Sequence, residues 1–292
     1  MIFICMTKDL KCNTENTHEF MKTYKFGYDA IKEEMGVFEY YDFEKRVVNL
    51  INNNRFSIIL KGRQQHISTI LAAYASWSIL NGKKIAFYTN SLHMGQYFIS
   101  KVRVILVNYG VEFERENKSQ FFLKNGGSIF TACRPTGIYA QFDEIIYDEA
   151  AFCDNLEEAI QVGVKRLNDN GKIILASTPN GYNKFFTLWE GSVLGDNDFK
   201  RIKITYKDNP RYDEEWVEGM KKRLNMNEKH IRQELYAEFI MPTPKKPKKT
   251  KNKLIQFRLN DDLFNKLSMR LIEDDINVSA YLRSLILKDV NE

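Results

Sequence analysis

The sequence has little of what marks zinc-stabilised, disulfide-bonded or membrane-spanning proteins. Its 292 residues include four cysteines and four histidines. No cysteines follow the CxxC spacing and the histidines are scattered, which argues against a structural zinc site and favours a reducing compartment. No apolar run reaches the ~18 residues that a membrane-spanning helix needs. The opening MIFICMTKDLKC lacks the basic leader of a secretory signal. We therefore expect neither membrane insertion nor secretion.

Positive charge is abundant in only one short segment. Residues 241–253 carry six lysines, no acid and three of the six prolines, whereas residues 1–240 have a net charge of +1 and residues 254–292 a net charge of −2. Prolines stiffen such a segment and mutually repelling lysines keep it solvated, so its composition predicts a linker. The alternative is an arm that binds phosphates.

Strand-like and helix-like patterns alternate through most of the chain. Residues 1–35 show no strong period, and we expect them to be irregular. Helical spacing of apolar residues covers 40–53, 70–80, 94–108, 156–166 and 213–238. Strand patterns occur in RFSIILKG, KKIAFYTN, FDEIIYDEAAF, GKIILASTPNG and RIKITYKDNP, and FFLKNGGSIFTAC is typical of a hairpin. The alternation predicts an α/β fold with a mostly parallel sheet covered on both faces.

A polar loop between the first strand and its helix has the layout of a phosphate-binding loop. In the usual pattern, GxxxxGK[ST], loop amides hold phosphates and the hydroxyl holds magnesium. The spacing from Gly62 to Ser68 fits, but His66 replaces the second glycine and Ile67 the lysine. Lys61, at the start of the loop, could reach the same phosphates. The alternative is an ordinary strand-to-helix connection.

Two adjacent acids end a later apolar strand. Asp148 lies 80 residues after Ser68 and is followed by Glu149. Motor ATPases need one carboxylate near magnesium and a second that orients the attacking water, which are the roles we assign to these residues in that order. The alternative is a pair of acids at a helix amino terminus. The strand at Ile85–Tyr88, between the two clusters in the sequence, favours an inserted-strand motor core over a simple kinase.

A third polar cluster, Ser177-Thr178-Pro179-Asn180-Gly181, follows another buried strand. Its hydroxyls could sense the γ-phosphate and relay its loss. By itself, however, Pro-Asn-Gly is a strong turn signal, so a plain turn is the alternative. Because ligands bind at the carboxyl ends of parallel strands, we expect the three clusters to lie together.

In order and spacing, the segments ILKGRQQHISTILAAYASW, FDEIIYDEAAF and ILASTPNGYNKFF resemble the ATPase domain of the large terminase subunit of tailed bacteriophages. The resemblance covers about residues 36–240. It implies a P-loop NTPase fold of the RecA-like (ASCE) class with ATP and Mg²⁺ as cofactors. It also implies DNA packaging into procapsids in the cytoplasm of the bacterial host. Double-stranded DNA, a portal, a small terminase subunit and further copies of the chain would be its partners.

The resemblance also implies roles for individual residues. Lys61 matches a Walker A lysine moved to the start of the loop, Arg63 an arginine that acts on the γ-phosphate, and Ser68 the magnesium hydroxyl. Asp148 and Glu149 match the Walker B and catalytic carboxylates, and Ser177-Thr178-Pro179 matches the coupling motif. Phe43 falls where the family has an aromatic residue against adenine, and Glu44 stands where it has glutamine. The candidate ATP-binding residues are thus Lys61, Gly62, Gln64, Ser68, Thr69 and Phe43.

The residues after 240 differ from the family pattern. Full large terminases continue into a nuclease domain with clustered carboxylates, which the last 52 residues do not show. We therefore expect an ATPase without its own nuclease, a truncated copy, or one half of a split gene.

Instead, residues 253–290 resemble a ribbon-helix-helix domain, with one strand in KLIQFRLN, a helix over 261–273 and a second helix from Val278. The resemblance implies that Gln256 and Arg258 read bases in the major groove. A hairpin that docks on another surface is the alternative. One strand and two helices in 39 residues cannot bury a core alone, so this module should dimerise or dock.

Two functions compete. The first is a DNA-translocating ATPase of the large-terminase type. The second is a non-enzymatic DNA-binding regulator whose ATPase-like body is a degenerate scaffold. Lys61, Arg63, Asp148 and Glu149 favour the enzyme, whereas His66 and Ile67 favour the regulator.

Overall fold

The computed structural model describes residues 16–23, 40–133, 140–224 and 226–240, together with residues 262, 263, 265–267, 269 and 281. The chain divides into two units, Met1–Pro242 and Thr243–Glu292.

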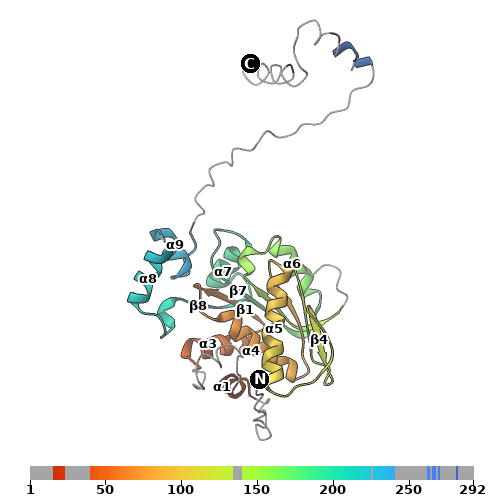
Figure 1. Ribbon diagram of the computed structural model, residues 1–292, viewed down its shortest axis with the longest axis vertical. Coiled ribbons are helices and arrows are strands. Elements are labelled where there is room, and N and C mark those ends of the chain that lie inside the picture. Colours follow the sequence, from red (N-terminus) through yellow and green to blue (C-terminus); the bar gives the residue numbers. More distant parts are fainter. Residues whose placement is uncertain are drawn as a thin grey trace, which may run out of the picture. The chain divides into compact units, whose positions relative to one another are not determined.

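The first unit is built on a mostly parallel sheet, as predicted (Figure 1). In the described residues its strands are β1 (Phe56–Lys61), β2 (Lys84–Tyr88), β3 (Phe113–Asn117), β4 (Gln120–Leu123), β5 (Ser128–Ala132), β6 (Phe142–Asp148), β7 (Leu167–Ser177) and β8 (Lys200–Ile204). The eight strands lie in the order β3-β4-β5-β2-β6-β7-β1-β8. Every neighbouring pair from β5 to β8 is parallel, and β3, β4 and β5 form antiparallel pairs at one edge. The hairpin predicted at residues 121–133 is the β4–β5 pair.

The strand inserted between β1 and β6 is not the one that the sequence suggested. Ile85–Tyr88 lies in β2, which pairs with β6 on the side away from β1. β7 fills the position between β1 and β6 and pairs with both. The inserted-strand core is therefore present, but it is formed by the strand that leads into Ser177.

Helices cover both faces of the sheet because strand residues alternate between them. Ile59 and Ile146 point to one face and pack with α3 (Asp42–Asn53), α4 (Ile67–Leu80) and α5 (Leu92–Asn108). Ile58 and Ile145 point to the other face, toward α6 (Leu156–Val164) and α7 (Lys184–Leu194). α4 is apolar on nearly all sides and is accordingly buried in the middle of its layer.

Two expectations about helices are corrected. The first 35 residues are not irregular throughout, because Thr17–Thr23 forms α1, which buries Phe20 and Met21 in the core. The helix expected over 213–238 is two helices, α8 (Glu214–Leu224) and α9 (Glu228–Glu234). Asn227 separates them because its side chain accepts a hydrogen bond from the His230 amide and starts a new helix.

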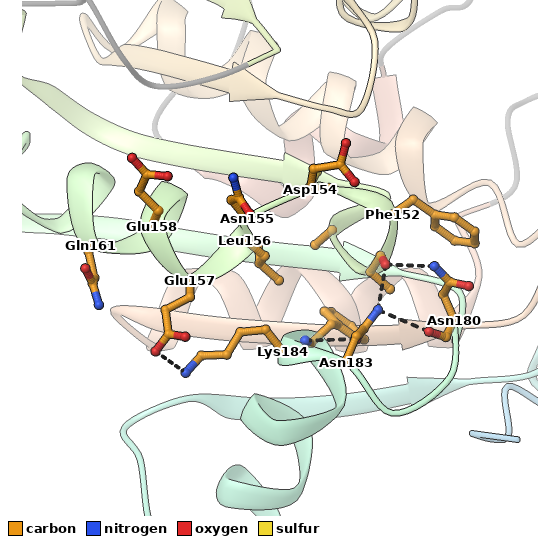
Figure 2. Close-up of a pocket in the computed structure, with 14 residues that line it drawn as sticks. Phe152, Asp154, Asn155, Leu156, Glu157, Glu158, Gln161, Asn180, Asn183 and Lys184 are labelled. Atoms are coloured by element: carbon orange, nitrogen blue, oxygen red, sulfur yellow. Dashed lines mark hydrogen bonds and ion pairs between the residues drawn. The ribbon is translucent and has the colours of Figure 1, made fainter. Parts of the chain in front are cut away.

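A cavity of about 700 Å³ opens beside the carboxyl ends of β6 and β7 (Figure 2). One wall is the 3₁₀ turn η1 (Ala150–Phe152), and the others come from α6 and from the loop before α7. The Asn180 and Asn183 side-chain amides both donate to the Ala151 carbonyl, at 3.0 and 2.7 Å. These bonds fix the loop after β7 to the turn after β6.

The described residues of the second unit, 262, 263, 265–267, 269 and 281, are helical. Those from 262 to 269 fall within the helix expected over 261–273. Residues 241–253, Gln256 and Arg258 lie outside the described residues. In the described part of the chain, no helix has the length and apolar character that crossing a membrane would require.

Candidate active site

The three polar clusters meet at one edge of the sheet, as the sequence predicts. Leu60 on β1 is in register with Ser177 on β7, and Asp148 on β6 is in register with Ala176. The carboxyl ends of three adjacent parallel strands therefore bring together the loop after Lys61, the acids at 148–149 and the segment from Ser177.

The loop after β1 has the backbone of a tight phosphate-binding turn despite its unusual residues. His66 replaces the expected glycine but has φ +56°, the left-handed conformation that glycine usually supplies. Gln64 is also left-handed, with φ +60°. Gly62 is required by close approach, because a Cβ there would lie 2.8 Å from the Leu235 carbonyl oxygen. Ser68 follows in the first turn of α4.

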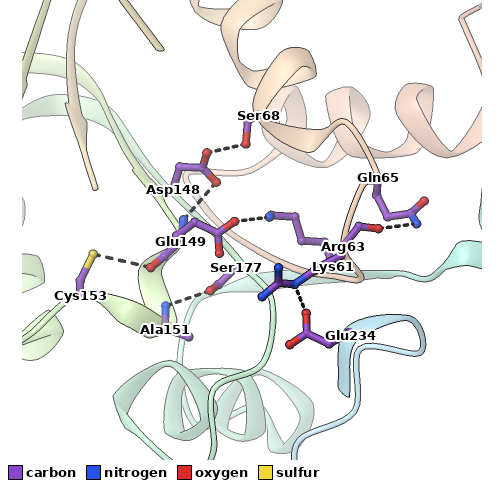
Figure 3. Close-up of polar contacts among 10 residues, drawn as sticks. All are labelled: Lys61, Arg63, Gln65, Ser68, Asp148, Glu149, Ala151, Cys153, Ser177 and Glu234. Carbon is purple, nitrogen blue, oxygen red and sulfur yellow. Dashed lines mark hydrogen bonds and ion pairs between the residues drawn. The ribbon is translucent and has the colours of Figure 1, made fainter. Parts of the chain in front are cut away.

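Two short polar pairs link this loop to the acids of β6 (Figure 3). Lys61 Nζ lies 2.6 Å from Glu149 Oε1, and its side chain is 9% exposed. Ser68 Oγ donates to Asp148 Oδ2 at 2.6 Å. Asp148 Oδ1 accepts from the Glu149 amide at 3.0 Å, and Glu149 itself adopts a left-handed conformation with φ +53°. Such a conformation is uncommon for glutamate, and it holds the Glu149 side chain toward the loop after β1.

The carboxylate of Asp148 is strongly desolvated. Burial raises its pKa, while the Lys61 ammonium opposes the rise and the Glu149 carboxylate adds to it. A divalent cation bound at Asp148 would stabilise the ionised carboxylate, which burial disfavours. Ser68 and Asp148 offer a hydroxyl and a carboxylate together, which are oxygen ligands that suit Mg²⁺. Within the described ranges no group of three or more His, Cys, Asp or Glu side chains could hold a metal ion, so the other ligands of a cation here would be waters or oxygens of a bound ligand.

Arg63 does not point freely into the site. Its guanidinium forms an ion pair with Glu234, at the end of α9, and its amide donates to the Glu234 carbonyl at 2.6 Å. The Tyr212 hydroxyl donates to the Gln64 carbonyl at 2.9 Å. Tyr212 and α9 therefore both contact the loop after β1. Glu234 and Tyr212 join the candidate site, although neither was among the residues predicted from the sequence.

The segment from Ser177 is attached to the turn that carries the acids. Ser177 Oγ accepts from the Ala151 amide at 3.0 Å, and Thr178 is 4% exposed. Asn180 reaches the same turn through the Ala151 carbonyl. Hydrogen bonds therefore join the loop after β7 to the turn that follows Glu149.

Two predicted ATP-binding residues lie differently from the expectation. Phe43 is 1% exposed and belongs to the apolar core, so its ring is not available to a ligand in this structure. Tyr41 stacks on it at a centroid distance of 6.2 Å and carries the Arg211 guanidinium over its ring. Thr69 Oγ1 accepts from Lys101 Nζ at 3.3 Å, on the side of α5.

Comparison with known proteins gives consistent matches. The model of the family "Terminase large subunit, T4likevirus-type, N-terminal" matches residues 58–258. The terminase large subunit of Escherichia phage T5 is 32% identical over 151 residues, which are 48% of this chain and 33% of that protein. The chain therefore matches only about a third of the length of that relative.

Solved structures show the same fold. A mutant ATPase domain of the Thermus phage P74-26 large terminase aligns with a TM-score of 0.55 at 18% identity, covering 70% of this chain and 95% of that one. The HK97 bacteriophage large terminase aligns with a TM-score of 0.61 at 13% identity, covering 78% of this chain and 55% of that one.

Proposed function

Because this chain belongs to the terminase large-subunit family, we propose that it is an ATP-hydrolysing motor subunit that translocates double-stranded phage DNA during packaging. The observation that carries the proposal is the double pairing at the strand ends, Lys61 with Glu149 and Ser68 with Asp148. These pairs unite in one place the cation, hydroxyl and two carboxylates that phosphoryl transfer from ATP requires.

The contacts suggest how the roles divide. Lys61 would bind the phosphates, since it is the only side-chain cation that the described residues bring into contact with Glu149. The backbone of Gly62 and Gln64 and the first turn of α4, with Ser68 and Thr69, would surround them. Glu149 would orient the attacking water once ATP draws Lys61 away. Arg63 would exchange Glu234 for the γ-phosphate.

Ser68 and Asp148 would hold Mg²⁺, which neutralises phosphate charge when it is bound. Nucleotide binding has support among proteins of the same fold, since the large terminase of a thermophilic bacteriophage has been solved in complex with ADP and with ATP-γ-S. Ser177, Thr178 and Pro179 would couple hydrolysis to movement, because Ser177 is bonded to the turn that carries Glu149.

The test is magnesium-dependent ATP hydrolysis by the full chain, with and without duplex DNA. Glu149→Gln should lower turnover by about 10²–10⁴-fold, the contribution of a positioned general base. It should leave ATP binding nearly intact, because Lys61 and the loop amides remain. Glu157→Gln is the matched control, since Glu157 is an exposed carboxylate on the neighbouring helix α6. Turnover of Glu149→Gln within a few-fold of wild type would refute the assignment.

The rest of the proposal concerns the assembly. The active form would be a homo-oligomer that works with a portal and a small terminase subunit in the host cytoplasm, and nuclease activity is not expected from these 292 residues. If wild type hydrolyses no ATP but binds DNA, the DNA-binding regulator with a degenerate ATPase scaffold becomes the better assignment. The left-handed backbone of His66 favours the ATPase over the regulator, because histidine in place of the usual glycine leaves the shape of the loop intact.

A further inference from the structure

β6 carries a second buried carboxylate, at the end opposite the candidate active site. Glu144 and Asp148 are four residues apart, so their side chains leave the same face of the strand. They are separated by about 13 Å along it, at ~3.3 Å per residue. Both contact α4, Asp148 at its first turn through Ser68 and Glu144 near its last turns through Tyr74 and Ser78.

Only one oxygen of this carboxylate is used. Glu144 is 4% exposed, and its Oε1 accepts from Tyr74 Oη at 2.9 Å and from Ser78 Oγ at 3.2 Å. Oε2 is buried and has no hydrogen-bond partner among the described residues. A buried acceptor without a partner is uncommon, because it loses its water and gains nothing in return.

Glu144 lines a cavity of about 570 Å³, which is in the size range of small-molecule sites. Tyr74 and Trp77 contribute aromatic rings to the cavity, and Asp143 and Asp169 contribute further carboxylates. Two lysines also line it, and each has contacts of its own. Lys172 Nζ donates to the Ile51 and Asn52 carbonyls, at 2.8 and 2.9 Å, and Lys83 Nζ lies 4.0 Å from Asp143. By formal count the lining holds three acids and two lysines.

We propose that this cavity binds a small aliphatic ammonium ion, of the diamine or polyamine class, with its ammonium group donating to Glu144 Oε2. A primary ammonium supplies both the missing donor and the compensating charge. The alkyl chain would lie against Trp77, whose ring face attracts a cation. A bare divalent ion fits less well, because it prefers several oxygen ligands to an aromatic wall.

The experiment is isothermal titration of the full chain, free of nucleotide, with putrescine (butane-1,4-diamine). Butane-1,4-diol serves as the neutral isostere, and sodium chloride is matched for ionic strength. Wild type should bind one diamine per chain and should not bind the diol. Glu144→Gln should weaken diamine binding by about 10- to 100-fold, which is the fold-change that corresponds to a charge-assisted hydrogen bond.

Glu44→Gln is the matched control, since Glu44 is equally buried, also has one oxygen without a partner, and lies outside this cavity. Its affinity for the diamine should equal that of wild type. Tryptophan fluorescence provides a second measurement, which holds even if Glu144→Gln does not fold. The diamine should change the emission of wild type but not that of Trp77→Phe. The proposal would be overturned by no binding to wild type, by equal binding of the diol, or by an undiminished fluorescence response in Trp77→Phe. Glu144 would then serve only to hydrogen-bond α4 to β6.

Discussion

Glu44 on α3 is a buried acid whose raised pKa should make the protein less stable as the pH rises from 4.5 to about 7. It is 1% exposed, and its Oε2 accepts from the Tyr41 amide at 2.9 Å. Its Oε1 is buried and has no partner among the described residues. Burial raises the pKa of Glu44 from 4.5 to about 7, although the Tyr41 hydrogen bond and the Arg211 charge oppose the rise. Replacement by glutamine removes the charge and keeps the acceptor for Tyr41.

The sign and size follow from proton linkage. The folded state holds the Glu44 proton more tightly than the unfolded state, so the full stability is present below pH 4.5 and is lost as the pH rises to about 7. The shift corresponds to about 3 kcal/mol at ~1.4 kcal/mol for each pH unit. At pH 8 we therefore expect Glu44→Gln to be more stable than wild type by about 3 kcal/mol, or roughly 6–12 °C in Tm for a domain of this size. At pH 4.5 the two proteins should differ little.

Urea unfolding followed by circular dichroism at several pH values between 4.5 and 8 measures the difference. Burial also raises the pKa of Glu144 and Asp148, so wild type alone would show overlapping effects. The difference between wild type and Glu44→Gln isolates Glu44, because distant sites contribute additively. A stability difference that does not grow between pH 5 and pH 8 would show that Glu44 is solvated in the folded protein.

Two further predictions concern ATP binding by Lys61 and base recognition by Arg258. Lys61→Ala should weaken ATP binding by about 10- to 100-fold, the value of a charged phosphate contact. Ile67→Ala should mainly lower stability, because Ile67 is buried in the core. Equal nucleotide affinity in Lys61→Ala and wild type would remove Lys61 from the site. In the full chain, Arg258→Ala should reduce discrimination between duplex sequences by about 1–3 kcal/mol. It should not change the salt dependence of DNA affinity, which the lysines of residues 241–253 would govern. Gel-shift titration at two salt concentrations measures both, and unchanged sequence preference would exclude base contact by Arg258.

Parallel-sheet logic made the position of the candidate site predictable from the sequence. Apolar strands that end in polar residues must place those residues at a common edge, and the loop after Lys61, Asp148 and Ser177 do meet there. The order of strands across the sheet was not predictable in the same way. Sequence order placed Ile85–Tyr88 between the clusters, but hydrogen bonding places β7 there. Local sequence patterns predict that a strand exists, but tertiary packing determines which strands lie beside it.

Residues that reach the site from elsewhere in the chain were not singled out by any local pattern. Glu234 belongs to a seven-residue helix and contacts the loop after β1 through its carbonyl, next to Gly62, and through its ion pair with Arg63. α1 was missed for a related reason, because seven residues are too few to display a helical period, and burial of Phe20 and Met21 stabilises it. Phe43 was matched to an adenine contact by the family resemblance; the structure packs it in the apolar core, and its role toward a nucleotide stays a prediction.

β6 shows most clearly what sequence and structure each contribute. β6 and the residue that follows it read FDEIIYDE, which contains the same Asp-Glu pair twice, at 143–144 and at 148–149. The rule that parallel strands bind ligands at their carboxyl ends selects the second pair as the catalytic candidate. The first pair then has no assigned function, and an acid at the start of a strand is ordinarily solvated. Only the packing of α4 across the strand buries Glu144 and leaves its Oε2 without a donor. The two pairs therefore differ in environment rather than in residue type, and that difference is what makes the amine titration informative.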